Sequence, residues 1–252
     1  MKIAKQQHAD LVHFPECALS GYAGVDHRNL KQFDWTRLHQ EMKTILKLAD
    51  RLDLWVVLGS THRLTGTHKP HNSLYVITPE GTVADRYDKR FCTLPDLTFY
   101  SPGDHFVTFD VHGVRCGLLI CYDIRFPELY REYYRRGVRL LLHSFYNARQ
   151  KPGAIHPKIM PPTAQAYAAV NNMFVSLNNS SAPYSWPSRF ITPDGLIAAS
   201  LPTDKPGVMV HVVDIHRKYY DASAPYRANA INGILHSGQT VQDPRSKDRT
   251  TY

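Results

Sequence analysis

The sequence predicts an α/β fold in which two β-sheets pack together and helices cover their outer faces. The central observation is an apolar strand, 114–120, followed by a short turn, a helix that Pro127 opens and Gly137 ends, and a second apolar strand, 138–143. Hairpins with polar turns make up much of the remaining chain. Strands mixed with hairpins and only two or three helices are typical of two packed sheets with helices outside.

The first half of the chain supplies one full helix and several strands. Residues 3–10 look like the end of a helix, and a short apolar strand follows at 11–14. Thr36 is placed to cap a helix because apolar residues then recur at helical spacing, at Leu38, Met42, Ile45, Leu46, Ala49 and Leu52. The next predicted elements are a buried strand at 54–60 and a hairpin at 73–77 and 82–87.

The second half continues in the same style up to about residue 213. A loop at 91–104, rich in Pro and Gly, leads into a hairpin whose second strand is 114–120. After the central unit, the predicted elements are a helix opened by Pro161 and Pro162, a strand at 173–177, a hairpin at 189–192 and 196–200, and a final strand at 207–213. We therefore expect a single domain over 1–252, with a polar, Tyr- and Arg-rich tail from about 214 to 252.

Composition excludes several classes of protein. Hydrophobic residues make up 43% and charged residues 21%, and no apolar run is long enough for a membrane span. The N-terminus does not resemble a signal peptide, and the four cysteines are scattered without a CxxC pair, so we expect a cytoplasmic protein with free thiols. The net charge of +8 is spread along the chain without a nucleic-acid-binding motif, and the histidines form no metal-binding pattern.

Three polar residues share one setting, because Glu16, Lys89 and Cys121 each follow the carboxyl end of an apolar strand. Such ends converge on one edge of a sheet, where ligands collect. A carboxylate can take the thiol proton, an ammonium can stabilise a carbonyl oxygen that becomes negative, and a thiolate can form a covalent intermediate. The helix start near Pro127 would also stabilise the Cys121 thiolate. The alternative is a core cysteine with two solvated strand ends.

Four motifs carry a family resemblance. They are FPE at 14–16, DKR at 88–90, YSPGD at 100–104 and GLLICYDIRFPE at 117–128. Their order and spacing, with intervals of 73 and 32 residues between the three polar residues, resemble the nitrilase superfamily, the carbon–nitrogen hydrolases. The segment around Cys121 is the most specific part. The resemblance covers roughly 9–213.

The resemblance implies a four-layer αββα sandwich of the nitrilase type that dimerises into αββα-αββα. It implies Glu16 as general base, Lys89 as oxyanion stabiliser, Cys121 as nucleophile and the backbone N–H of Tyr122 as a second oxyanion donor. The substrate would be a small amide or carbamoyl compound that loses ammonia or an amine, with no metal or organic cofactor. Many members carry a further glutamate, and its position is taken here by Asp96, which is one methylene shorter.

Two departures from the family pattern indicate a divergent subgroup with a short N-terminus. The family usually has roughly 25 more residues, a strand and a helix, before the FPE strand. Three explanations stay open: the chain starts inside the usual domain, does without that strand, or borrows it from a partner. The family's RAxEN pattern is replaced near 165–172, where the corresponding residues are Tyr167, Ala168, Val170 and Asn171.

Other residues are candidates for substrate binding. Arg125 could hold a substrate carboxylate, which would favour an ω-amidase or a carbamoyl-amino-acid hydrolase, or it could pair with Glu128 or Asp123. The family pattern suggests that Glu128 supports Lys89 through a hydrogen bond. His143 and Asn147 follow the next strand and are expected to line the pocket, unless His143 is a core residue.

Three alternatives stay open. Nitrile hydrolysis would use the same three residues, and a Cys–His hydrolase or acyltransferase would pair Cys121 with His143. A catalytically degenerate binding protein would have no activated thiol. The expected partners are a small-molecule amide and further copies of the chain, as a homodimer or higher homo-oligomer that the tail contacts, with neither nucleic acid nor membrane involved.

Overall fold

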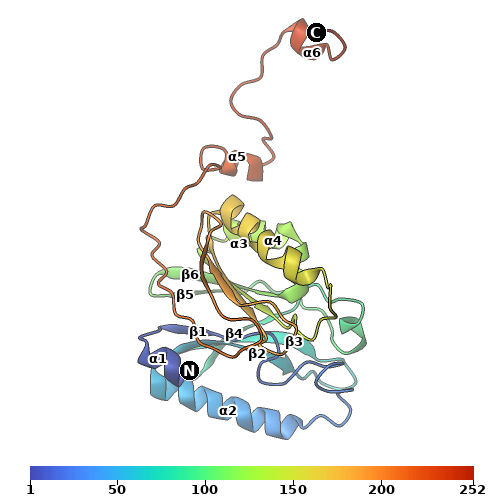
Figure 1. Cartoon of the computed structure of the whole chain (residues 1–252), viewed down its shortest axis with the longest axis vertical. Helices are drawn as coiled ribbons and strands as arrows, with labels where there is room; N and C mark the ends of the chain where they lie inside the picture. The colour runs from blue at the N-terminus through green and yellow to red at the C-terminus, as the bar shows by residue number, and fades with distance from the viewer.

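The computed structural model describes residues 1–252 and contains two mixed β-sheets packed face to face (Figure 1). The four-stranded sheet has the order β1-β2-β3-β4, and the six-stranded sheet has the order β10-β9-β8-β7-β6-β5. The strands of the first sheet are β1 (Leu11–His13), β2 (Trp55–His62), β3 (His71–Ile77) and β4 (Val83–Asp88). Those of the second are β5 (Thr108–Val111), β6 (Val114–Ile120), β7 (Leu140–Phe145), β8 (Phe174–Asn179), β9 (Arg189–Ile191) and β10 (Ile197–Ser200).

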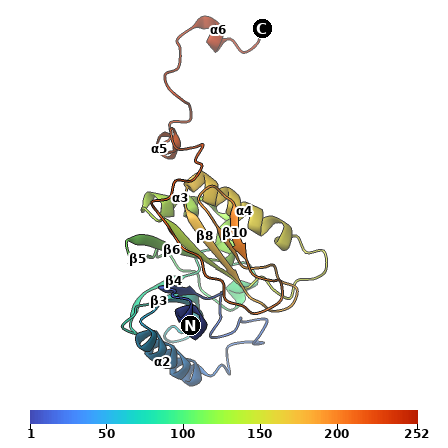
Figure 2. The same cartoon turned by 60° about the vertical axis from the view of Figure 1, so that its left-hand side comes forward.

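Helices cover the outer face of each sheet, which confirms the predicted layers. The helix α2 (Trp35–Leu52) lies outside the four-stranded sheet, and α3 (Pro127–Arg135) with α4 (His156–Asn171) lies outside the six-stranded sheet (Figures 1 and 2). The shorter helices are α1 (Lys2–Gln6), η1 (Asp96–Thr98), η2 (Cys121–Arg125), α5 (Arg227–Ile231) and α6 (Pro244–Lys247). No helix combines the length and hydrophobicity that a membrane span requires.

Two predicted helix starts were wrong. The cap of α2 is Asp34 rather than Thr36, because the Asp34 carboxylate accepts a hydrogen bond from the Arg37 N–H at 2.8 Å. The helix α4 begins at His156, ahead of the predicted start at Pro161. Pro161 and Pro162 lie inside it, where their nitrogens cannot donate to the carbonyls four residues earlier.

The apolar core lies mainly between the two sheets and beneath α3 and α4. In β6, Leu118, Leu119 and Ile120 are fully buried, because a parallel strand in the middle of a sheet is covered on both faces. The strands β6 and β7 pair in parallel with Leu119 opposite His143. Their carboxyl ends therefore reach the same edge of the six-stranded sheet.

The predicted strand at 207–213 does not form. Met209 and Val213 pack against the core, whereas Val208, Val210 and Val212 are exposed by 42%, 39% and 78%. This alternation suits a strand, but no neighbouring strand pairs with the segment. A groove of about 640 Å³ lies between it and β1, so the β-forming sequence has no hydrogen-bonding partner at this position.

Ile215 and Tyr219 still pack against the core, and the chain beyond them leaves the sandwich and projects away from it (Figures 1 and 2). Arg227 anchors its first part, because its side chain donates to the Val170 carbonyl at 2.9 Å and pairs with Asp221 at 2.8 Å. Farther along, Leu235 and Val241 are exposed by 83% and 69%. This part of the chain has no core of its own.

Candidate active site

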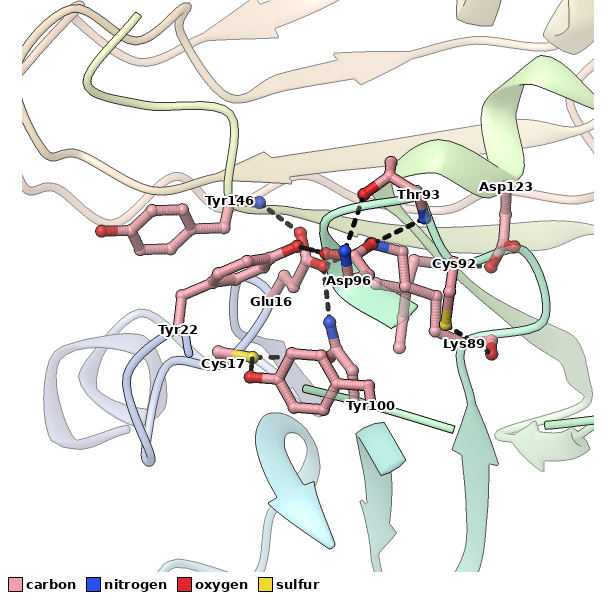
Figure 3. A network of polar contacts seen from close by, with 12 residues as sticks. Glu16, Cys17, Tyr22, Lys89, Cys92, Thr93, Asp96, Tyr100, Asp123 and Tyr146 are labelled. Atoms are coloured by element: carbon pink, nitrogen blue, oxygen red, sulfur yellow. Dashed lines mark hydrogen bonds and ion pairs between the residues drawn. The ribbon is translucent and has the colours of Figure 1, made fainter. Parts of the chain in front are cut away.

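The segments that follow β1, β4 and β6 meet at one edge of the sandwich. Lys89 follows β4 directly, and its Nζ lies 3.0 Å from Oε1 of Glu16, which follows β1 (Figure 3). Both residues are only 1% exposed. A buried ion pair of this kind requires further hydrogen bonds to offset the lost hydration of its charges.

Those further bonds fix the Glu16 carboxylate. Oε1 also accepts from Asn72 Nδ2 at 2.7 Å, and Oε2 accepts from the Tyr146 backbone N–H at 2.6 Å. Tyr146 follows β7, so donors from both sheets hold this carboxylate. Oriented in this way, Glu16 can accept a proton from only a narrow range of directions.

Asp96, which stands at the position of the family's further glutamate, supplies a second buried carboxylate. It is 3% exposed and its Oδ2 accepts from Lys89 Nζ at 2.8 Å and from the Thr93 N–H at 3.0 Å. Burial alone would raise the pKa of Asp96, but the charge and hydrogen bond of Lys89 lower it below its ordinary value. Burial likewise opposes the charge of Lys89, but Glu16 and its other anionic neighbours raise its pKa well above the usual range.

Cys121 lies at the junction of β6 and η2 with a left-handed φ of 46°. This conformation is uncommon for a residue other than glycine and turns the side chain away from the strand direction. The residue is only partly exposed. Burial and the adjacent Glu16 charge raise the pKa of its thiol, while Lys89 acts in the opposite direction.

The expectation that a helix start holds a Cys121 thiolate was therefore wrong. The helix α3 begins only at Pro127, and η2 separates it from Cys121. The dipole of a helix acts mainly within its first turn. The resting side chain is a thiol, whose proton must be removed by a base.

Asp123 joins the segments that carry Lys89 and Cys121. Its carboxylate accepts hydrogen bonds from the Ile120 N–H at 3.0 Å, the Phe91 N–H at 2.9 Å and the Tyr87 hydroxyl at 2.8 Å. Burial raises its pKa to about 6, although these donors lower it. Sequence reasoning missed this role of Asp123, which it considered only as a partner of Arg125.

The predicted roles of Arg125 and Glu128 meet little support. Glu128 is exposed on α3 and has no hydrogen bond to Lys89, so that prediction was wrong. Arg125 is exposed and forms an ion pair with neither Glu128 nor Asp123. Burial raises the pKa of Tyr167 on α4, the Glu128 charge raises it further and the Arg125 charge opposes the rise, which indicates that both side chains lie near α4. Tyr122, by contrast, remains at the site beside Cys121, with its ring edge-on to Phe126 at 5.5 Å.

His143 and Asn147 are core residues with partners of their own. The Nδ1 of His143 lies 2.7 Å from the Tyr130 hydroxyl, and its ring stacks on Phe145 at 4.3 Å. Burial lowers the pKa of His143 well below its ordinary value, so it is a weak base. Asn147 accepts from Trp186 Nε1 at 3.1 Å. This arrangement disfavours a Cys121–His143 pair.

The structure adds residues that sequence reasoning missed. Tyr22 and Asn72 contact Asp96 and Glu16 from segments 74 and 56 residues away in the chain. Tyr22 lies in a loop whose Gly-rich sequence indicates only a turn, and Asn72 lies inside a strand. No group of His, Cys, Asp or Glu side chains in residues 1–252 is arranged to hold a metal ion.

A buried carboxylate–ammonium pair beside a cysteine at a strand end, on two stacked sheets, defines a class of thiol hydrolase. Residues 1–222 match the carbon–nitrogen hydrolase family, and the chain belongs to that family. Its relatives include an (R)-stereoselective amidase from Pseudomonas sp., which is 34% identical over 171 residues. That alignment covers 68% of this chain and only 58% of the amidase. The human omega-amidase NIT2 is 26% identical, with 73% of this chain and 72% of that protein covered.

Solved structures show the same fold. A variant of the amidase from Nesterenkonia sp. AN1, with acrylamide added at its active-site cysteine, superposes with a TM-score of 0.75 at 21% identity. The match covers 92% of this chain and 89% of the amidase. Another variant of that amidase, in complex with butyramide, has a TM-score of 0.70 at 22% identity and covers 81% and 78% of the two chains.

Proposed function

We propose that the protein hydrolyses the C–N bond of a small amide or carbamoyl compound through a thioester on Cys121. The observation that carries this proposal is the buried Glu16–Lys89 pair, 3.0 Å apart, at the strand end that also presents Cys121. Amidases among the relatives agree with it. The resting thiol also agrees, because it calls for the base that Glu16 supplies.

In the first half of the reaction, Glu16 takes the Cys121 proton as the sulfur attacks the carbonyl carbon. The carbonyl oxygen becomes negative and is stabilised by the Lys89 ammonium and the Tyr122 backbone N–H. Lys89 has three N–H groups, of which Glu16 and Asp96 occupy two, so one is left for this oxygen. The intermediate collapses, the C–N bond breaks, and the proton held by Glu16 passes to the leaving ammonia or amine.

In the second half, water replaces the amine. Glu16 takes a proton from the water, whose oxygen attacks the thioester carbon, and Lys89 again faces the developing oxyanion. The C–S bond breaks, the proton returns to the sulfur, and a carboxylic acid leaves. The same carboxylate thus serves as base and acid in each half.

The proposal is tested by measuring ammonia release from a panel of small aliphatic amides, carbamoyl compounds and nitriles. We expect amides to be turned over and Cys121→Ala to be inactive on all of them. Turnover of nitriles alone would favour the alternative chemistry on the same residues. If no compound is turned over and iodoacetamide modifies Cys121 no differently from an ordinary thiol at any pH, the chain is a binding protein on a hydrolase fold.

We also propose that the protein forms a homodimer or larger homo-oligomer and that the segment 214–252 contacts a second copy. The exposed apolar side chains of Leu235 and Val241 lie on a segment that projects from its own subunit. We propose that a second copy of the chain covers these side chains. The first part of this segment is held on the body of its own chain by the packing of Ile215 and Tyr219 and by the Arg227 bond to the Val170 carbonyl, whereas Leu235 and Val241 lie beyond these contacts.

A further inference from the structure

We propose that Tyr22 is a positioning residue that fixes Asp96 and, through it, the direction of the Lys89 ammonium. This inference rests on the proposed function and assigns a role to a residue outside the Glu16, Lys89 and Cys121 set. It starts from the hydroxyl of Tyr22, which donates a hydrogen bond to Oδ1 of Asp96.

Asp96 has no free choice of orientation while this bond is present. Its other oxygen, Oδ2, receives Lys89 Nζ at 2.8 Å and the Thr93 N–H at 3.0 Å. The Tyr22 hydroxyl occupies the remaining oxygen, so a donor holds each end of the carboxylate. An aspartate has a short side chain, and a rotation of its carboxylate would move Oδ2, the atom that accepts the hydrogen bond from Lys89.

The ring of Tyr22 is itself held firmly. It stacks on Tyr146 with centroids 4.9 Å apart and an interplanar angle of 30°, and it meets Tyr100 edge-on at 6.1 Å (Figure 3). Asp26 fixes both stacked residues, because it accepts from the Tyr22 N–H at 2.9 Å and from the Tyr146 hydroxyl at 3.0 Å.

This placement links the two carboxylates of the site. Tyr146 donates its backbone N–H to Glu16 at 2.6 Å, and Tyr22 donates its hydroxyl to Asp96. Lys89 lies between the carboxylates, with its Nζ 5.9 Å from the centre of the Tyr22 ring. The stacked pair of Tyr22 and Tyr146 therefore fixes the distance between the Asp96 and Glu16 carboxylates, both of which bind Lys89 Nζ. This in turn fixes the direction of the remaining N–H of Lys89.

The test is a double-mutant cycle of Tyr22→Phe, Asp96→Asn and the double variant, assayed on an amide from the panel. Phenylalanine keeps the stacked ring and removes only the hydroxyl. We expect Tyr22→Phe to lower kcat by about tenfold to a hundredfold with KM nearly unchanged, because Lys89 acts on the transition state. In the Asp96→Asn background, the same change should cost less than about twofold.

Two results would overturn the inference. One is an equal loss from Tyr22→Phe in both backgrounds, and the other is a raised KM at unchanged kcat, which would make Tyr22 a substrate contact. Tyr75→Phe is the matched control, because it removes a tyrosine hydroxyl whose partner, His62 at 2.6 Å, is not a residue of the site. We expect this control to keep the wild-type kcat and KM.

A second readout separates this inference from the proposed function. The rate of Cys121 alkylation by iodoacetamide reports on its neighbours without any turnover. We expect Tyr22→Phe to slow alkylation, because Lys89 stabilises the thiolate, and to have no such effect when Asp96→Asn is present. If no amide or nitrile is turned over, the proposed function is wrong. If Tyr22→Phe slows Cys121 alkylation equally in the wild-type and the Asp96→Asn proteins, the proposed role of Tyr22 is wrong.

Discussion

The Nζ atom of Lys89 lies 3.0 Å from Oε1 of Glu16, and neither side chain is more than 1% exposed. Because Asp96 is also bound to this ammonium, removing Lys89 would leave two carboxylates buried together. The Glu16–Lys89 pair therefore contributes both to the proposed reaction and to the stability of the fold.

Replacing Lys89 by methionine should lower kcat by about a hundredfold to a thousandfold, because an oxyanion loses its charged donor. The free energy of unfolding should fall by about 3 kcal/mol, because two buried carboxylates lose their counterion. His143→Gln should retain most of the kcat. Steady-state kinetics and chemical denaturation measure both effects. A severe loss of kcat in His143→Gln beside a mild one in Lys89→Met would instead support a Cys–His hydrolase.

The stability of the protein should fall as pH drops below about 6.5. Burial lowers the pKa of His13 from 6.5 to about 3, and its ring nitrogens lie 3.0 Å and 2.8 Å from the hydroxyls of Ser176 and Ser144. In this window the unfolded chain binds a proton that the folded chain does not. Each such histidine therefore contributes a slope of up to about 1.4 kcal/mol per pH unit.

His143 should steepen the same pH dependence of the unfolding free energy, because burial lowers its pKa as well and it also takes up a proton on unfolding. Chemical denaturation between pH 7 and pH 4 measures how the free energy of unfolding changes with pH. In His13→Gln this slope should be smaller by the amount that corresponds to one proton taken up on unfolding. An unchanged slope in this variant would mean that His13 is protonated in the folded protein.

Gly59→Ala should damage the site although no polar residue of the site is replaced. An added Cβ would lie 2.2 Å from the Pro15 carbonyl and 2.7 Å from the Cys17 N–H, so the turn that carries Glu16 must move. We expect kcat to fall at least about tenfold and stability by about 2 kcal/mol. Gly113→Ala is the control, since it has a φ of +81° but no atom within 4 Å. It should cost about 1 kcal/mol and leave kcat unchanged, and equal kcat losses in both variants would refute the argument.

Removing the tail should weaken self-association while the sandwich stays folded. A chain ending at residue 232 keeps Arg227 but loses Leu235 and Val241, two of the exposed apolar residues of the projecting segment. Sedimentation velocity should show a dimer or larger species for the full chain and a smaller one for the truncated chain. A monomeric full chain with a tail that proteases remove rapidly would contradict the proposal.

Local sequence predicted the layers and the strand ends well, because buried strands and helix faces have their own periodicity. Glu16, Lys89 and Cys121 could be grouped from their positions after strands alone. The errors came where a partner decides the outcome. The segment 207–213 has the composition of a strand but no neighbour to pair with, and Glu128 lies on the exposed face of α3, which local sequence does not distinguish from a face turned toward Lys89.

The remaining parts of the site depend on contacts between distant segments. Tyr22 contacts Asp96 and Asn72 contacts Glu16 across 74 and 56 residues of sequence. The spacing of apolar residues in the sequence does not predict contacts over such separations. The left-handed backbone of Cys121 and the raised pKa of its thiol also follow from packing around the junction of β6 and η2. These features require the three-dimensional structure.

The proposed mechanism requires that Cys121 carries a covalent acyl group during turnover. Rapid acid quenching of the enzyme with a small amide, followed by peptide mass spectrometry, measures it directly. We expect the peptide that contains Cys121 to gain the mass of the acyl group, and Cys121→Ala to show neither adduct nor ammonia release. Continued ammonia release by Cys121→Ala, or an adduct on Cys17 or Cys92 alone, would contradict the account.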